Sequence, residues 1–268
     1  NPEKNILIRV DFNVPVFDGN IIDNSRIVSA KSSISKLIES NNKIFLISHF
    51  GRPNGKYNKK LSLEFACENV AKIIGVEKIH FIDEINIEKI EKKKKEIKFG
   101  EVCLLENIRF YDGEEKNDFN FAKKLSESFD IFVNDAFSAS HRKHASIVGL
   151  TNFLPTLIGD SFLKEIKNLD SFINNPKKPN TAIIGGSKIS TKTELLSNLV
   201  KYFDNIAIGG AMANTFLLGK GFNIGKSLVE ETLLDTAKEI LNKSRNHNCN
   251  LILPVDVVCS SDQKNPKS

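Results

Sequence analysis

Short apolar runs rich in β-branched residues alternate with longer amphipathic stretches along this whole sequence. This alternation is typical of βαβ units, in which helices cover the faces of a parallel sheet. The sequence predicts strands over residues 5–12, 43–50, 78–82, 101–107, 131–137, 181–186, 205–210 and 250–259. The fold class that follows is α/β, with doubly wound parallel sheets of the Rossmann-like kind.

Helices are predicted between these strands, for example over residues 25–40 and 62–75. The second has Ser62 at its start and Gly75 at its end, which are residues favoured at the two ends of a helix. We interpret the charged run EKKKKE at residues 91–96 as the solvated face of a helix and not as a basic binding patch.

The segment 159–178 breaks this rhythm, because an apolar helical pattern runs into a Pro-Lys-Lys-Pro turn. Pro176 and Pro179 should end that helix sharply. The length of 268 residues allows two domains of ordinary size. We therefore predict α/β domains at 1–158 and 179–268, joined by an interdomain helix and hinge at 159–178.

Composition limits the functional class. No apolar run approaches the roughly 18 residues of a membrane span, and no signal peptide is present, so we expect a cytoplasmic protein without membrane contact. The cysteines Cys67, Cys103, Cys249 and Cys259 have no metal-ligand spacing, which favours free thiols in a reducing compartment. The net charge of +5 suits nucleic acid or a small anion. Because Trp is absent and only three Tyr are present, stacking platforms are scarce and we expect no nucleic-acid partner.

A basic cluster is predicted at the carboxyl ends of the first-half strands, where open α/β sheets bind ligands. The loops after four strands carry polar or basic residues, and Arg26 stands at the start of the first helix, whose N-terminus is partly positive. The members are Asp11, Asn13, Arg26, His49, Arg52, Arg109, His141 and Arg142. Because guanidinium groups bind carboxylate or phosphate oxygens bidentately, four arginines predict a pocket for a small, highly charged anion.

Each member also has a simpler interpretation. An isolated arginine after a strand is usually a surface ion-pair partner, although four of them weaken that interpretation. His141 and His144 have no third ligand spaced for zinc, so an anion contact or a structural hydrogen bond is favoured for them. Asp11 is either a general base or an acceptor of hydrogen bonds from a hydroxyl or an arginine, and its basic neighbours favour the second role.

The second half places a Gly-Gly pair at the end of each of two successive strands, in TAIIGG and NIAIGG. Glycine pairs let a flat or phosphate-bearing ligand approach the backbone, although each pair alone fits a plain tight turn equally well. Thr191 and Glu194 have capping-box spacing, which predicts that Lys192 lies in the first turn of a helix. A GxGxxG fingerprint and a Walker motif are both absent.

Six motifs in this order, RVDFNVP, SHFGRP, ENIRF, SHRKHAS, GGSKISTK and GGAMANTF, closely resemble the phosphoglycerate kinase family. The resemblance covers nearly the whole chain. It implies a two-domain enzyme that exchanges a phosphoryl group between 1,3-bisphosphoglycerate with ADP and 3-phosphoglycerate with ATP. Mg²⁺ would be bound with the nucleotide, and the domains would close about the hinge. We expect a monomer whose partners are these small molecules.

The resemblance also assigns residues. The substrate site would contain, together with the basic cluster, Asp11, Phe12, Asn13, Arg26, His49, Phe50, Gly51, Arg52, Arg109, His141 and Arg142. The nucleotide site would contain Gly186, Ser187, Lys188, Lys192, Gly209, Gly210 and Ala211, the last replacing a glycine of many relatives. Arg26 and Lys192 would stabilise the transferred group as the catalytic pair. No general base and no metal ligand is assigned within the chain.

The chain starts at Asn1 and stops at Ser268, short of the length usual in the family. We therefore expect a piece trimmed at its beginning, with an incomplete second domain that lacks a further glycine-rich phosphate turn. One alternative is that the 268-residue chain is a non-catalytic module that binds phosphoglycerate. Another is a nucleotide-dependent α/β enzyme acting on a different phosphorylated acid.

Overall fold

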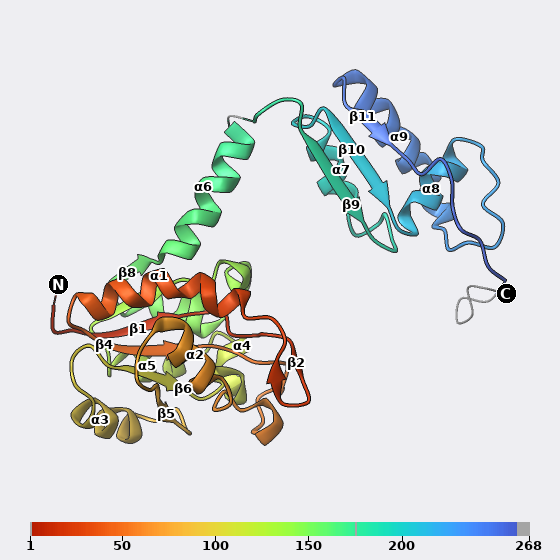
Figure 1. Ribbon diagram of the computed structural model, residues 1–268. Coiled ribbons are helices and arrows are strands. Elements are labelled where there is room, and N and C mark those ends of the chain that lie inside the picture. Colours follow the sequence, from red (N-terminus) through yellow and green to blue (C-terminus); the bar gives the residue numbers. More distant parts are fainter. Residues whose placement is uncertain (1, 175, 262–268) are drawn as a thin grey trace. The chain divides into compact units, whose positions relative to one another are not determined.

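The computed structural model describes residues 2–174 and 176–261. Contacts divide the chain into two compact units, Asn1–Asn168 and Leu169–Ser268, each with its own parallel sheet (Figure 1). The division falls within helix α6 (Asp160–Asn174), inside the segment 159–178 that the sequence marks as interdomain. Residue 1 and residues 262–268, which the predicted domains 1–158 and 179–268 include, lie outside the described residues.

The first unit contains a six-stranded sheet in the order β5-β6-β4-β1-β7-β8, and all of its neighbouring strands are parallel. Five of these strands were predicted from the sequence, whereas β8 and the short antiparallel hairpin β2–β3 were not. The bounds are β1 Asn5–Arg9, β2 Val16–Phe17, β3 Asn20–Ile21, β4 Lys43–Ile47, β5 His80–Ile82, β6 Val102–Leu105, β7 Ile131–Asn134 and β8 Thr156–Ile158.

Helices cover both faces of this sheet, and alternate residues of β1 enter two different cores. Ile6 and Ile8 pack with Ile27 of α1 (Ser25–Glu39) and with residues of α2 (Ala66–Ile74). Leu7 points the other way, into a core shared with α3 (Ile87–Glu96) and α5 (Phe119–Ser126). Burial on both faces explains why the strand sequences are almost uniformly apolar. The doubly wound α/β class is therefore confirmed.

Helix ends depart from the prediction in one place. The helix predicted from Ser62 begins only at Ala66, because the Ser62 hydroxyl and the Leu63 N–H both donate to Glu106 and hold these residues in an irregular turn. Gly75 ends the helix in a left-handed conformation, with φ of 90°, as predicted. The EKKKKE run lies in α3, where lysines pair with glutamates three residues away, which confirms a charged helix face.

The second unit contains a three-stranded parallel sheet in the order β11-β10-β9. Its strands are β9 Thr181–Gly185, β10 Asn205–Gly209 and β11 Asn250–Ile252, and its helices are α7 Thr193–Leu199, α8 Met212–Gly219 and α9 Leu234–Asn246. Helices α7, α8 and α9 share one apolar core with β10. The strand predicted over residues 250–259 ends at Ile252, since Pro254 cannot donate to a strand partner.

Shorter segments complete the chain. They are α4 Asp112–Glu115 and the single turns Lys59–Leu61, Ile108–Phe110, Phe137–Ala139, Ala145–Gly149, Leu150–Asn152 and Glu231–Leu233. All four cysteines are free, as expected, and Cys103 and Cys249 are buried while Cys67 is half-buried and Cys259 exposed. No described helix is both long and apolar enough to cross a membrane.

Candidate functional site

The candidate site of the first unit lies where β1, β4, β6 and β7 end. Register pairs Arg9, the last residue of β1, with Ile47 of β4 and with Asn134 of β7. The segments that follow these three residues therefore leave the sheet at one edge. This arrangement explains how polar residues far apart in the sequence reach a single site.

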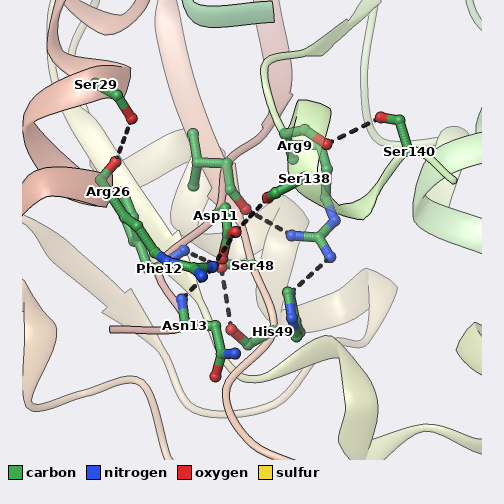
Figure 2. A network of polar contacts seen from close by, with 12 residues as sticks. Arg9, Asp11, Phe12, Asn13, Arg26, Ser29, Ser48, His49, Ser138 and Ser140 are labelled. Atoms are coloured by element: carbon green, nitrogen blue, oxygen red, sulfur yellow. Dashed lines mark hydrogen bonds and ion pairs between the residues drawn. The ribbon is translucent and has the colours of Figure 1, made fainter. Parts of the chain in front are cut away.

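Asp11 organises the loop after β1 (Figure 2). Its carboxylate accepts hydrogen bonds from the Arg26 guanidinium and the Ser138 hydroxyl, and from the backbone N–H of Asn13 at 3.0 Å. The Asp11 side chain is 11% exposed and that of Arg26 is 46% exposed. The carboxylate thus accepts bonds from an arginine and a hydroxyl, the role that the sequence favoured over a general base.

A second set of bonds fixes the loop after β4. The Gly51 N–H donates to Asn13 Oδ1 at 3.0 Å, and the Phe50 N–H donates to Asn107 Oδ1 at 3.2 Å. Arg109 Nη1 donates to the Gly51 carbonyl at 2.8 Å. Gly51 has φ of 62°, which favours glycine, so the sequence SHFGRP can make this turn without strain. Three separate loops are therefore joined at the sheet edge.

The Phe12 side chain is fully buried in the core. Its backbone N–H donates to Ser48 Oγ at 2.8 Å. Because the ring faces the core, only backbone atoms of Phe12 remain near the site. Its assignment to substrate binding can therefore concern the backbone alone.

His49 is buried and feels the charges of several arginines. Burial, together with the positive charges of Arg9, Arg109, Arg142 and Arg26, lowers its pKa to about 2, so the imidazole is neutral at physiological pH. Burial and the neighbouring charges of Arg142 and Arg52 also lower the pKa of Arg109, which the Glu115 carboxylate opposes. Arg26, Arg109 and Arg142 act on His49, and Arg52 and Arg142 act on Arg109, so the structure places the four arginines that the sequence singled out in one region. His141 is exposed and accepts a hydrogen bond from Arg142 Nε at 3.2 Å.

Sequence reasoning missed the buried polar residues beneath this cluster. Arg9 is 1% exposed and Glu114 is fully buried, and the Ser146 hydroxyl links them. The run NILIR reads as an apolar strand, so the partner of its arginine could not be located from the sequence. The only available signal was that a charged residue ends a strand that is otherwise apolar.

The glycine pairs of the second unit lie side by side, because Gly185 of β9 and Gly209 of β10 are register partners. The Gly186 carbonyl accepts a hydrogen bond from the Met212 N–H at 3.0 Å. Gly210 has φ of 71°, and a Cβ at this residue would lie 2.6 Å from the Gly186 carbonyl oxygen. The second turn therefore requires glycine at residue 210 to pack against the first turn.

The lysine loop of the second unit corrects the predicted capping box. Lys192 is the N-cap residue of α7 and does not lie in its first turn. The Thr191 hydroxyl donates to the Lys188 carbonyl and caps no N–H. Instead Glu230, distant in sequence, accepts bonds from the N–H groups of Ile189 at 2.6 Å and Ser190 at 3.1 Å. A local capping box is not needed once this carboxylate holds the turn.

The remaining residues assigned to the nucleotide lie close to these turns. The aliphatic part of Lys192 lies against Gly186, because a Cβ at Gly186 would be 3.2 Å from Lys192 Cε. Ser187 and Lys188 are exposed, and Ala211 is half-buried next to the start of α8. Within residues 2–174 and 176–261 no group of three or more His, Cys, Asp or Glu side chains is placed to hold a metal ion.

The sequence profile of the family described as "Phosphoglycerate kinase" matches residues 2–268. The chain is 47% identical over 255 residues to "Phosphoglycerate kinase" of Caulobacter vibrioides, a match that covers 95% of this chain and 64% of that protein. It is 46% identical over 259 residues to the protein of that name in Borreliella afzelii, covering 97% of this chain and 66% of the relative.

Solved structures of phosphoglycerate kinases are also similar to the chain. The structure of phosphoglycerate kinase from Coxiella burnetii matches with a TM-score of 0.81 at 38% identity, covering 96% of this chain and 64% of that one. Phosphoglycerate kinase from Pyrococcus horikoshii matches with a TM-score of 0.80 at 29% identity, covering 95% and 65%. The chain thus spans about two thirds of the length of these relatives.

Proposed function

Because the chain belongs to the phosphoglycerate kinase family, we propose that the protein transfers a phosphoryl group reversibly between 1,3-bisphosphoglycerate with ADP and 3-phosphoglycerate with ATP. The proposal concerns the whole protein, since the chain spans 64% of the Caulobacter relative. The observation that carries it is the cluster of arginines around a neutral His49 at one sheet edge.

The first unit is proposed to bind the phosphoglycerate. Its ligand would carry a phosphate and a carboxylate, and each charge-assisted bond from a guanidinium contributes about 1.5–3 kcal/mol. Arg52 and Arg142 form no ion pair with a carboxylate among the described residues, so their charges are available to a ligand. Arg26 is held by Asp11, and a ligand oxygen would have to share or replace that contact.

The second unit is proposed to bind the nucleotide. Gly185 and Gly209, at the ends of β9 and β10, have open space beside their backbone. The Lys192 side chain lies against the turn at Gly186. The exposed Lys188 precedes Lys192 in the same loop. These features fit a base or sugar against the glycines, with the lysines directed to the phosphates.

Phosphoryl transfer requires little covalent chemistry from the protein, because alignment and neutralisation of the oxygens lower most of the barrier. Arg26 and Lys192 are proposed to stabilise the transferred group, and no general base is needed. The phosphates of the nucleotide are ligands that Mg²⁺ commonly uses in proteins. We propose that Mg²⁺ enters as part of the nucleotide substrate.

The remaining assignments are proposals of the same kind. The two units would close about residues 159–178 to bring the substrates together and exclude water, which otherwise competes as the acceptor. The protein is proposed to act as a cytoplasmic monomer. Closure would be tested by small-angle scattering with and without both substrates, and an unchanged radius of gyration would contradict it.

The decisive experiment is a coupled assay of the whole protein with 3-phosphoglycerate and ATP. Arg26→Ala and Lys192→Ala should each lower kcat strongly while thermal stability stays close to that of the wild type. Lys31→Ala on the same helix as Arg26, and the exposed Lys201→Ala, are matched controls that remove a charge away from the site. A folded wild-type protein without turnover, or either active-site variant at near-normal rate, would contradict the proposal.

Calorimetry on the 268-residue chain separates the alternative of a binding module. That alternative predicts binding of 3-phosphoglycerate without turnover, and full activity of the chain would contradict it. A folded chain that does not bind 3-phosphoglycerate would favour another phosphorylated acid as the substrate.

A further inference from the structure

The buried Arg9 lies behind the candidate site and contacts one of its members directly. Arg9 Nη2 is 3.1 Å from His49 Nδ1, a contact drawn as a dashed line in Figure 2. Arg9 is 1% exposed and therefore remote from any ligand in solution, so its position calls for a role other than ligand contact. Its other bonds run to the carbonyls of Val10 at 2.6 Å and Ile47 at 3.5 Å and to Ser146 Oγ at 2.9 Å.

The chemistry of the two side chains determines which ring nitrogen carries the proton. A guanidinium has only donors, and it stays protonated in proteins. Nδ1 of His49 must therefore be the acceptor, so in a neutral ring the proton sits on Nε2. Among the described residues Nε2 of His49 has no hydrogen-bond partner. A ring fixed in this form therefore has an Nε2–H group that is available to donate a hydrogen bond.

Glu114 supplies the negative charge that offsets the free-energy cost of burying the Arg9 guanidinium. Its carboxylate accepts bonds from the Ser146 hydroxyl at 2.6 Å and the Ser146 N–H at 2.8 Å, and the same hydroxyl accepts from Arg9 Nε. Burial alone raises the pKa of Glu114, but the His144 ring, the Arg9 charge and the Ser146 donors together lower it. Glu114 is thus ionised, and a buried chain runs from it through Ser146 and Arg9 to His49.

We propose that Arg9 is a positioning residue that holds His49 as the neutral Nε2–H tautomer, so that the imidazole donates a hydrogen bond to an oxygen of the anionic substrate. The ligand part of this inference rests on the proposed function, whereas the tautomer does not. The groups that face His49 are Arg9, Arg26, Arg109 and Arg142, all positive, and they oppose protonation of the ring together with burial. His49 thereby binds the anion through a directed hydrogen bond from Nε2 and not through a positive charge. Its contribution to the binding free energy therefore does not vary across the physiological pH range.

Nitrogen NMR of the ¹⁵N-labelled chain tests the tautomer without any substrate. Long-range proton–nitrogen spectra distinguish a protonated ring nitrogen from a bare one, and His49→Gln identifies the signals of His49 among the five histidines. The expected result is a protonated Nε2, a bare Nδ1 and no titration between about pH 5 and pH 8. A proton on Nδ1, or a titration of His49 within that range, would overturn the proposal.

Arg9→Met removes the donor to Nδ1 and should let His49 exchange between tautomers, with a pKa higher than in the wild type. Because this variant leaves Glu114 buried without its countercharge, it could fail to fold. The double variant Arg9→Met with Glu114→Gln removes both charges and gives the same readout in a neutral core. A single Nε2–H tautomer in the folded double variant would show that Arg9 does not control the ring.

Two replacements of His49 test the ligand contact. The amide nitrogen of His49→Gln can occupy the place of Nε2, whereas that of His49→Asn reaches only the place of Nδ1. We expect His49→Asn to weaken 3-phosphoglycerate binding roughly tenfold to hundredfold, and His49→Gln to weaken it much less. Equal losses in the two variants would contradict a donor at Nε2. A wild-type chain with the expected tautomer but no affinity for 3-phosphoglycerate would instead contradict the proposed function.

Discussion

Substitution of Gly210 by alanine tests the close contact between the two glycine turns of the second unit. Gly210 has φ of 71°, and a Cβ there would lie 2.6 Å from the oxygen and 3.0 Å from the nitrogen of Gly186. The left-handed conformation costs alanine about 1–2 kcal/mol. Displacement of the packed backbone adds about 1–3 kcal/mol. The structure therefore predicts a loss of about 2–5 kcal/mol in the stability of the sheet that β9 and β10 form.

Hydrogen exchange followed by mass spectrometry measures this loss in the second unit alone. Amides of β9 and β10 should exchange roughly 30-fold to 4,000-fold faster in Gly210→Ala, since each 1.4 kcal/mol is a factor of ten. The matched control is Gly209→Ala, because a Cβ at this neighbouring residue meets no atom within 4 Å and its φ is not positive. Exchange in Gly210→Ala within twofold of that in Gly209→Ala would refute the reasoning.

Three further predictions concern carboxylates. Glu114→Ala leaves Arg9 buried without its countercharge and should lower the free energy of unfolding of the first unit by about 3–5 kcal/mol, measured by urea denaturation; a loss below 1 kcal/mol would contradict the buried link. Because folding lowers the pKa of Glu114, its contribution to stability is present above the ordinary carboxyl pKa of about 4.3 and is lost as the pH falls through the lower folded value. The urea midpoint of the wild type should therefore fall more steeply on acidification than that of Glu114→Gln, and parallel curves would count against this sign. Glu230→Gln can accept fewer bonds from the turn at residues 189–190, so we expect faster amide exchange there and weaker ATP binding, with Glu231→Gln as the control.

The fold was largely predictable because buried parallel strands appear in a sequence as short apolar runs rich in β-branched residues. All eight predicted strands are present, although most end earlier than expected, for example β1 at Arg9, β4 at Ile47 and β11 at Ile252. The strand β8 was missed because it has only three residues, Thr156–Ile158, which is too short to show a strand pattern in the sequence. The start of α2 was misplaced because Glu106, more than forty residues away, takes the Ser62 hydroxyl that would otherwise cap a helix. Such long-range competition leaves no local pattern in the sequence.

The candidate site was predictable only where its residues follow strands. The arginines of the loops could be found because the carboxyl ends of parallel strands share an edge, and the structure brings these residues together. The buried chain from Glu114 to Arg9 could not be found, because its members lie in a short helix, a strand and an irregular turn with no common spacing. In the second unit Glu230 replaced the capping box for the same reason.

The balance of charge at the first sheet edge explains why a neutral His49 suits an anion site. Three arginines there have a carboxylate partner, and the pairs are Arg9 with Glu114 through Ser146, Arg26 with Asp11, and Arg109 with Glu115. Arg52 and Arg142 have no such partner among the described residues, so about two positive charges remain uncompensated. A phosphate monoester carries about −1.5 to −2 at pH 7, so the phosphate of the proposed ligand alone would offset those two charges, and its carboxylate would add a further negative charge. A protonated His49 would add a third charge that repels the arginines in the absence of ligand, whereas the neutral ring adds a directed donor without that cost.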